Sequence, residues 1–256
     1  MDPRSFFIVW MTVFGAMIGS FLNVCIYRLP LKKSLWWPPS SCPSCGRRLA
    51  WFENVPIVGY LALRGRCRTC RAAISSRYAI VEALTAAMFG AATWYYGPTL
   101  LLASRLVLGC TLIVLFAIDL EHQLLPNVIT LPFILIGFAF SFFVEPGWQS
   151  SLIGILVGGG SLLTMFYVWL WLRKQEALGM GDPKMLAMIG AFVGWKLTIL
   201  TLVLASFSGS IVGVTLIVLR RADMKSMIPF GCFLAFGAAI AATAGPSLID
   251  WYLAFY

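Results

Sequence analysis

Charge is scarce in this sequence. Only 11% of its 256 residues are charged, 10 are acidic and 1 is a histidine, whereas 60% are hydrophobic and the mean hydropathy is +0.88. A chain this poor in charge cannot cover the surface of a soluble domain, which excludes a soluble fold. The formal net charge of +9 would favour nucleic acid in a soluble protein. In a membrane protein, Lys and Arg instead indicate which loops are cytoplasmic, so we expect no nucleic-acid partner.

Other absences exclude further classes of protein and one interpretation of the first apolar run. The sequence shows no repeat of solenoid or propeller period and no low-complexity stretch. No small-residue cleavage motif follows the first apolar run, 6–24, and its single preceding cation, Arg4, is offset by Asp2. We therefore expect this run to be a retained membrane span rather than a signal peptide.

Apolar runs of about bilayer length, near 20 residues each, make up most of the chain. The expected spans are 6–27, 78–96, 99–118, 128–144, 151–172, 184–194, 196–219 and 229–250. The run 184–194 is too short to cross a core of about 30 Å at about 1.5 Å per residue, so it is tilted, re-entrant or extended past Lys196. The prediction is an all-α, polytopic membrane helix bundle of about eight spans. Its predicted domains are a first span (1–27), a cytoplasmic loop domain (28–77) and a membrane domain (78–256).

The cations are concentrated in three segments. Of the 19 Lys and Arg residues, 16 lie in 28–77, 173–184 and 220–225. Because such residues gather in cytoplasmic loops, eight spans with the first running inward would place all three segments in the cytoplasm. Without the short run, the last basic segment would lie outside, so parity favours two crossings between Asp182 and Arg220.

Two aspartates lie at the edges of apolar runs, where burying charge is costly. Asp119 ends the run 99–118, and Asp182 follows Gly179 and Gly181. The topology places both at the cytoplasmic ends of spans. Each has a simpler reading: Asp182 before a proline suits an ordinary helix start, and Asp119 suits an interfacial position.

As a pair, the two aspartates have a chemistry that neither has alone. Two carboxyl groups that share a proton can activate water as a base and protonate a leaving amine as an acid. Gly179 and Gly181, lacking Cβ atoms, would let a substrate backbone approach Asp182. We predict that Asp119 and Asp182 are the catalytic pair of an aspartic endopeptidase. The competing classes are a transporter whose aspartates carry protons or cations, and a non-catalytic assembly factor whose aspartates only cap helices.

The seven cysteines fall into two groups. Cys25, Cys110 and Cys232 lie in apolar runs, where packing explains them. The others form two C-x2-C pairs with 21 residues between them, at Cys42, Cys45, Cys67 and Cys70. Four thiolates in two knuckles are the ligand set of a closed tetrahedral zinc site.

Zinc competes with two other uses of these cysteines. Two disulfides would require an oxidising compartment, whereas the cations place this loop in the cytoplasm, and an iron–sulfur cluster fits two separated knuckles less well. A catalytic zinc is disfavoured because four thiolates leave no open position and the only histidine, His122, lies in another loop. We therefore predict a structural zinc that stabilises a module too poor in apolar residues to form its own core.

The sequence also resembles a known family over nearly its whole length. The matching residues are Gly19-Ser20-Phe21-Leu22-Asn23-Val24, Tyr27-Arg28-Leu29-Pro30, the two cysteine pairs, Trp51-Phe52-Glu53-Asn54-Val55-Pro56, Leu63-Arg64-Gly65-Arg66-Cys67, Ser76-Arg77-Tyr78, Val81-Glu82, Asp119, Leu125-Pro126-Asn127, Gly-x-Gly-Asp ending in Asp182, and Ile228-Pro229-Phe230-Gly231. Together they resemble the type IV prepilin peptidases, which include type II secretion members. Gly-x-Gly-Asp alone would also suit presenilin-like proteases. One departure is Cys232, where the family usually has proline.

The resemblance implies that Asp119 and Asp182 form the aspartic dyad. The implied substrate is a prepilin or pseudopilin with a short basic leader and an apolar helix, cleaved after a glycine at the cytoplasmic face of the bacterial inner membrane. Many members also methylate the new N-terminus with S-adenosylmethionine, an activity linked to the cysteine loop. No glycine-rich nucleotide loop is present to assign contacts to that cofactor.

Two further expectations concern how the substrate is held. Acids that could offset the basic face for a basic leader are Glu53, Glu121, Glu176 and Asp223. The apolar helix of the substrate would dock against small residues such as the glycines at 158–160. Tight packing between this protein's own helices explains those glycines equally well.

Overall fold

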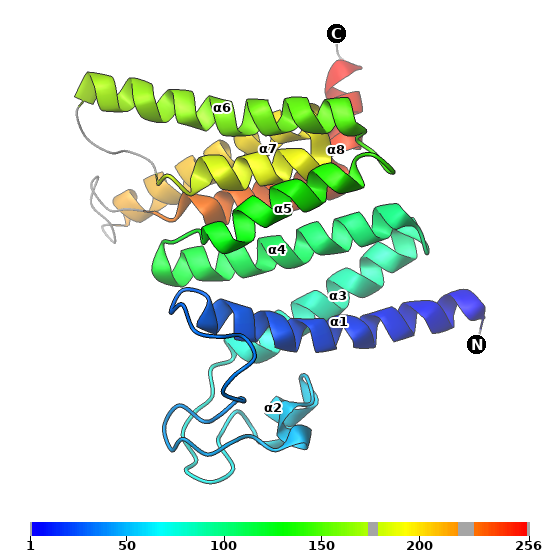
Figure 1. Ribbon diagram of the computed structural model, residues 1–256, viewed down its shortest axis with the longest axis vertical. Coiled ribbons are helices and arrows are strands. Elements are labelled where there is room, and N and C mark those ends of the chain that lie inside the picture. Colours follow the sequence, from blue (N-terminus) through cyan, green and yellow to red (C-terminus); the bar gives the residue numbers. More distant parts are fainter. Residues whose placement is uncertain (1, 174–178, 220–227, 255–256) are drawn as a thin grey trace. The chain divides into compact units, whose positions relative to one another are not determined.

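The computed structural model describes residues 2–173, 179–219 and 228–254 (Figure 1). Within these ranges the chain is helical, with isolated β-bridges but no strand, which confirms the predicted all-α class. The helices are α1 (Pro3–Arg28), η1 (Trp51–Asn54), α2 (Val58–Ala62), α3 (Arg77–Tyr96), α4 (Leu100–His122), α5 (Asn127–Phe140), α6 (Trp148–Arg173), α7 (Asp182–Val218) and α8 (Phe230–Leu253). The chain divides into two compact units, Met1–Val114 and Leu115–Tyr256.

In the first unit, α1 and α3 pack directly against each other (Figure 1). A Cβ atom on Gly15 would lie 2.6 Å from Cβ of Phe89, and one on Gly19 would lie 2.7 Å from Cα of Glu82. Both distances are too short for any side chain, so the two glycines permit the close approach of the helices.

Helix α4 contributes to both units, and its last turns belong to the second. The helix ends where Gln123 adopts a φ of 49°, and Pro126 then precedes α5. Proline has no N–H for a continuing helix, and its ring disfavours helical backbone in the preceding residue. This boundary leaves Asp119 in the last turn of a long apolar helix.

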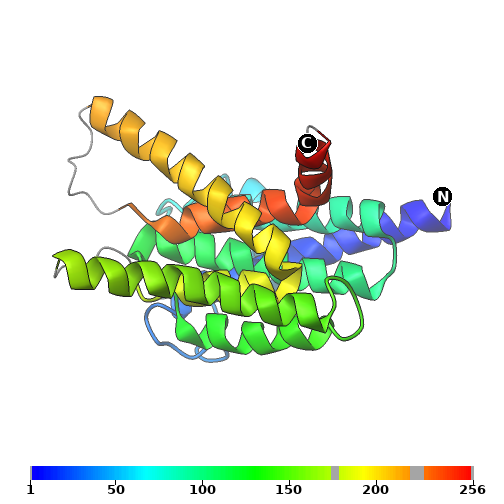
Figure 2. The ribbon, with the colours of Figure 1, turned by 90° about the horizontal axis from the view of Figure 1, so that it is seen from above.

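Helix α7 breaks at Gly194, whose φ of 77° and ψ of 171° are not helical. A Cβ atom on Gly158 of α6 would lie 2.6 Å from the carbonyl oxygen of Leu186 and 3.1 Å from Cγ2 of Thr198. On a straight helix those two residues would be about 18 Å apart, so the chain must fold back between them. Figure 2 shows this reversal, with the second half of α7, in yellow to orange, running back across the unit.

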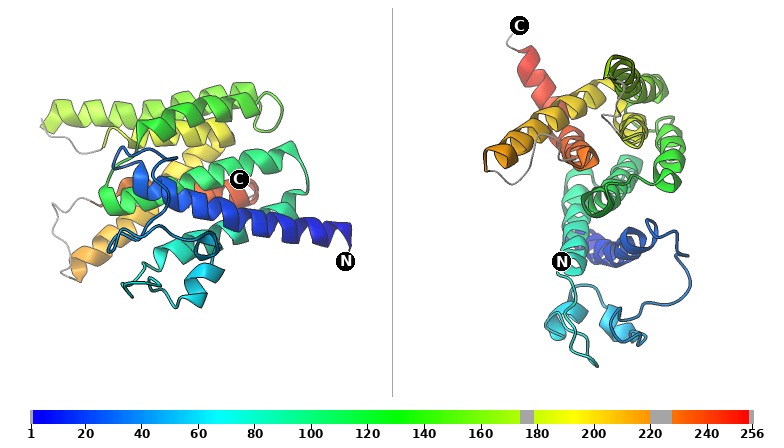
Figure 3. Two further views of the ribbon diagram at one scale, coloured as in Figure 1. Left: turned by 60° about the horizontal axis from the view of Figure 1, so that its bottom comes forward. Right: turned by 90° about the vertical axis from the view of Figure 1, so that its left-hand side faces the viewer.

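Helix α6 packs closely along the first half of α7, as the right-hand view of Figure 3 shows nearly end-on. Ser151 donates a 2.7 Å hydrogen bond from Oγ to the carbonyl oxygen of Ala191. A Cβ atom on Gly154 would lie 2.5 Å from the carbonyl oxygen of Gly190. In the stretch 158–160, the first two glycines also face α7. Helix packing therefore explains them, and the stretch is not a free docking surface at those positions.

Five described helices are long and apolar enough to cross a membrane: α1, α4, α6, α7 and α8. The protein is therefore a multi-pass membrane protein, while the expected number of eight spans is not confirmed. Helix α5, with 14 residues, is apolar but shorter. The expected boundary between 184–194 and 196–219 coincides with the break at Gly194 inside α7.

Candidate functional site

Asp119 is buried in the last turn of α4, with 5% of its surface exposed. Its Oδ2 accepts a 3.0 Å hydrogen bond from the backbone N–H of Cys232, the third residue of α8. The first N–H groups of a helix have no partner within the helix, and the helix dipole favours a negative charge at this end. The start of α8 thus provides a carboxylate site that Asp119 fills.

Cys232, where the family usually has proline, supplies a backbone N–H that proline lacks. Proline has no backbone N–H, so a family member with proline at this position cannot make this hydrogen bond to Asp119. The Cys232 thiol lies 3.4 Å from the carbonyl oxygen of Phe116, which is also in α4. Cys232 therefore contacts α4 through both its backbone and its side chain.

Asp182 is the first residue of α7 and is also buried, with 6% of its surface exposed. Gly181, rather than Asp182, occupies the N-cap position, so Asp182 is not the helix cap that a simpler reading proposed. The carboxyl group of Asp182 lies within electrostatic reach of Asp119. The fold of the second unit thus brings together two aspartates that are 63 positions apart in the sequence.

Leu125 holds the surroundings of the pair in place. A Cβ atom on Gly181 would lie 2.7 Å from Cβ of Leu125, and one on Gly231 would lie 3.1 Å from its Cδ1. The Cβ atom on Gly231 would also lie 2.8 Å from Oδ2 of Asp119. Gly181 is thus explained by packing against Leu125, whereas a Cβ atom on Gly179 would make an ordinary 3.6 Å contact with Oδ2 of Asp182.

Two residues that connect α5 and α7 next to the pair have no role that the sequence predicts. Lys184 Nζ donates a 2.9 Å hydrogen bond to Oδ1 of Asn127. Asn127 is the last residue of the family motif Leu125-Pro126-Asn127, and Lys184 lies two residues after Asp182. Their positions in the sequence are the signal that could have pointed to these residues. The contact itself joins helices far apart in the chain, so no local sequence pattern predicts it.

The four cysteines predicted as metal ligands come together in the first unit. All four are free, and their Sγ atoms lie within 4.8 Å of one another. The Sγ atoms of Cys42 and Cys70 are 3.7 Å apart. Tetrahedral Zn–S bonds of about 2.3 Å imply sulfur separations of about 3.8 Å. The residues therefore fit a tetrahedral metal ion, and the four free thiols do not form the two disulfides that were the alternative.

Each cysteine pair lies in a tight turn, and the two turns have the same hydrogen bonds. The N–H of Cys42 donates to the carbonyl oxygen of Arg47 at 2.9 Å, as the N–H of Cys67 does to Ala72 at 2.9 Å. Four residues after the first cysteine the backbone has a positive φ in both turns, 70° at Gly46 and 58° at Arg71. The left-handed conformation directs the chain back past the sulfur atoms.

The backbone of the turns also prepares the thiols for a metal. N–H groups of Cys70 and Thr69 lower the pKa of Cys67 to about 6. N–H groups of Cys45 and Ser44 lower the pKa of Cys42. Because the thiolate is the form that binds metal, these hydrogen bonds favour the metal-binding state at Cys42 and Cys67. At Cys70 the N–H of Ala72 lowers the pKa, but desolvation and hydrogen bonds with the neighbouring cysteines outweigh it and raise the pKa to about 11.

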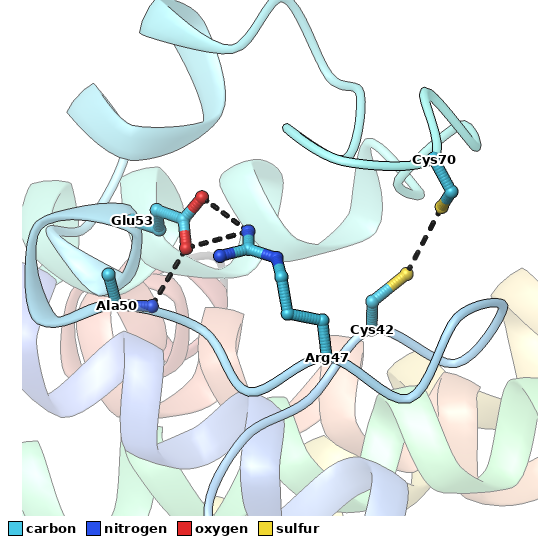
Figure 4. A network of polar contacts seen from close by, with 5 residues as sticks. All are labelled: Cys42, Arg47, Ala50, Glu53 and Cys70. Carbon is cyan, nitrogen blue, oxygen red and sulfur yellow. Dashed lines mark hydrogen bonds and ion pairs between the residues drawn. The ribbon is translucent and has the colours of Figure 1, made fainter.

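Glu53 links the first turn to η1 (Figure 4). Arg47 Nη2 donates to both of its carboxylate oxygens, at 2.7 and 2.9 Å, and the N–H of Ala50 donates to Oε2 at 2.7 Å. These bonds, that of Arg47 first, lower the pKa of Glu53. Because the Glu53 side chain is fully buried, the expectation that it attracts a basic leader is wrong. Its role is structural.

Glu82 of α3 connects the cysteine module to the first helix pair. Its Oε2 accepts a 2.7 Å hydrogen bond from the N–H of Ile57, which adopts a φ of 63°. Such a backbone angle is rare for a β-branched residue. The buried carboxylate thus stabilises a strained residue directly before α2.

Of the other three acids expected to attract a basic leader, the structure describes one. Glu121 is exposed two residues after Asp119. Glu176 and Asp223 lie outside the described residues.

The fold and site define a multi-pass helical membrane protein with two buried aspartates at helix ends and a four-cysteine cluster suited to a metal. Comparison with known families gives two matches: the Bacterial Peptidase A24 N-terminal domain over residues 13–96, and the Type IV leader peptidase family over 106–214. The chain belongs to the type IV leader peptidase family. Both predicted catalytic aspartates lie in the second matched region.

Similar proteins cover almost the whole chain. A prepilin leader peptidase/N-methyltransferase of Pseudomonas aeruginosa is 36% identical over 97% of this chain and 94% of that protein. One of the same name from Pseudomonas putida is 36% identical with the same coverage. Another, from Myxococcus xanthus, is 43% identical over 82% of this chain and 63% of that protein. No solved structure gives a significant match.

Proposed function

We propose that this chain is a membrane aspartic endopeptidase that removes the short basic leader of prepilins or pseudopilins and methylates the new N-terminus. The observation that carries the peptidase assignment is the pairing of Asp119 and Asp182. Both are buried in one unit, and their carboxyl groups interact electrostatically. Family membership supports the same chemistry.

The geometry supports different roles for the two aspartates. The start of α8 stabilises negative charge on Asp119, which suits it to accept a proton from water. The resulting hydroxide attacks the carbonyl carbon of the scissile peptide, and the proton held by Asp182 passes to the leaving nitrogen as the C–N bond breaks. Cleavage leaves the proton on Asp119 and none on Asp182, so its transfer from Asp119 to Asp182 restores the starting state.

The cytoplasmic face of the inner membrane is the proposed place of cleavage. The support is the concentration of 16 of 19 cations in the segments 28–77, 173–184 and 220–225, of which the second contains Asp182 and the third lies shortly before α8. Glu121, exposed beside Asp119, remains a proposed partner for the basic leader. The competing transporter assignment gives no account of the cysteine cluster.

The metal proposed for the four cysteines is zinc in a structural role. Cys42, Cys45, Cys67 and Cys70 would hold it, and four sulfur ligands would leave no open position for substrate. The ion would cross-link the two turns, whose Sγ atoms lie within 4.8 Å of one another. Wild-type protein should contain about one zinc per chain, and Cys42→Ser should lower both the zinc content and the stability of the module.

S-adenosylmethionine is the proposed methyl donor. A groove of about 410 Å³ in the second unit is lined by apolar residues and serines, with no carboxylate among the described residues that line it. It therefore does not fit a cofactor with a positively charged sulfonium group. We assign no residue to the methyl donor and derive no step through it.

Both activities can be tested on purified protein in detergent with a prepilin substrate. The leader is released in the peptidase reaction, which a gel shift detects. Mass spectrometry of the mature N-terminus, with and without S-adenosylmethionine, then detects one added methyl group. An intact prepilin after prolonged incubation would contradict the peptidase function, and a mature but unmethylated N-terminus would contradict the second activity alone.

A further inference from the structure

Two adjacent tryptophans project from the segment that follows the first membrane helix. Trp36 is 87% exposed and Trp37 is 67% exposed. Exposed tryptophan is unusual on a polar module, because burial of its ring is strongly favourable. These side chains point to a surface that contacts something other than bulk water.

The segment that carries them is fixed to the end of α1. Arg28, the last residue of that helix, donates hydrogen bonds to three carbonyl groups in this segment: those of Ser34 at 2.8 Å, Leu35 at 3.3 Å and Pro38 at 2.5 Å. Because α1 is long and apolar enough to cross a bilayer, its last residue lies where the hydrocarbon core ends. The two tryptophans are therefore held close to the membrane interface.

Cations surround the tryptophans. Arg48 lies over the ring of Trp37, 5.7 Å from its centroid, and Lys32 and Lys33 are exposed just before the pair. Residues 29–76 contain eight cations and one acid, Glu53, which is buried in its pair with Arg47. The exposed surface of this segment is thus positively charged without a local counter-charge.

We propose that the Trp36–Trp37 segment is a membrane-interface anchor, which rests the cysteine module on an anionic lipid leaflet. Tryptophan rings partition into the headgroup region, while Lys32, Lys33 and Arg48 bind lipid phosphates. A leaflet suits both features at once, because it offers negative charge above apolar chains. A basic leader peptide would be repelled by the same cations. This inference depends on α1 crossing the bilayer and is independent of the catalytic assignment.

The test uses the full-length protein in nanodiscs, made either of phosphatidylcholine alone or with phosphatidylglycerol added. Hydrogen exchange in residues 29–40 should slow at least about fivefold in the anionic nanodiscs. Trp36→Ser with Trp37→Ser should abolish the difference, and so should Lys32→Gln with Lys33→Gln, which keeps both rings. Trp94→Ser, an exposed tryptophan on α3, is the matched control and should retain it.

A second measurement keeps the proposal testable if the tryptophan variant is unstable. Bromine on the lipid chains near the headgroups should quench tryptophan fluorescence more in the wild type than in Trp36→Phe with Trp37→Phe. Equal exchange in both lipids together with equal quenching would overturn the proposal. Protection that appears only after a prepilin peptide is added would also overturn it, by assigning this surface to the substrate.

Discussion

The backbone N–H of Cys232 donates a 3.0 Å hydrogen bond to the buried carboxylate of Asp119. This bond connects the first turn of α8 to the last turn of α4. The neighbouring residue, Gly231, has no side chain that could separate the two helices. The position of the Asp119 carboxylate therefore depends on the absence of a Cβ atom at residue 231.

Gly231→Ala should displace the Asp119 carboxylate, because the added Cβ would lie 2.8 Å from its Oδ2. A misplacement of catalytic atoms by about 1 Å can cost about 100-fold in rate, so kcat/KM for prepilin cleavage should fall by roughly that factor. Gly160→Ala is the control, since its Cβ would meet no atom within 4 Å. Equal activity of the two variants would show that the close approach at Gly231 does not position the carboxylate.

Gly194→Ala should destabilise the second unit. The φ of 77° and ψ of 171° at Gly194 are essentially restricted to glycine, and a Cβ there would lie 2.7 Å from Cβ of Pro146. A strained residue costs about 1–3 kcal/mol, which corresponds to a fall in Tm of about 2–12 °C. Gly213→Ala, whose Cβ would make an ordinary 3.5 Å contact with Ile228, should leave Tm nearly unchanged. A Tm for the Gly194 variant as high as that of this control would contradict the reversal.

Local sequence patterns predict several of these features well. Hydropathy places most of the helices, and the boundary between the expected spans 184–194 and 196–219 coincides with the break at Gly194. The spacing of the cysteines identifies a cluster that the fold brings together. In each case the information lies within one segment, where a helical period or a turn is determined by neighbouring residues.

Arg71→Gly should stabilise the second cysteine turn. Arg71 adopts a φ of 58° at the position that Gly46 occupies in the first turn, and the left-handed conformation costs a non-glycine residue about 1–2 kcal/mol. Part of that gain is offset because glycine is more flexible in the unfolded chain. A net stabilisation of about 0.5–1 kcal/mol should slow hydrogen exchange at residues 65–74. Gly46→Ala is the reciprocal test and should accelerate exchange in the first turn. Faster exchange in Arg71→Gly, or slower exchange in Gly46→Ala, would contradict the equivalence of the two turns.

Glu53 should make the stability of the cysteine module depend on pH. Its folded-state pKa is lowered by Arg47 and by the N–H of Ala50. The stabilisation is therefore fully present above the unfolded-state pKa, near 4.3, and is lost as pH falls through the lower folded-state value. With metal removed by chelator, wild type should lose exchange protection at residues 47–59 as the pH falls through this range, after correction for intrinsic rates. Glu53→Gln should be less protected at pH 7 and should show little further loss, whereas a parallel decline in both proteins would contradict this role.

The contacts that complete the aspartate pair and the cysteine module could not be predicted from local sequence patterns. Leu125, between α4 and α5, lies against Gly181, which precedes α7, and Gly231 of α8, and Cys232 bonds to a residue 113 positions earlier. Glu53 looked like a free acid in a basic loop because its pairing with Arg47 depends on how the turn folds. Such contacts arise from packing between segments, which leaves no periodic signal in either segment.

The central claim is that Asp119 and Asp182 act together in cleavage, and the cleavage rates of Asp119→Asn and Asp182→Asn test it most directly. Each variant, purified in detergent and incubated with a prepilin, should cleave at least about 100-fold more slowly than wild type, as loss of a general acid or base requires. Asp250→Asn, at an exposed aspartate of α8, should cleave at the wild-type rate, and all three should share the wild-type Tm within a few degrees. Wild-type processing by either Asp119→Asn or Asp182→Asn would contradict the account.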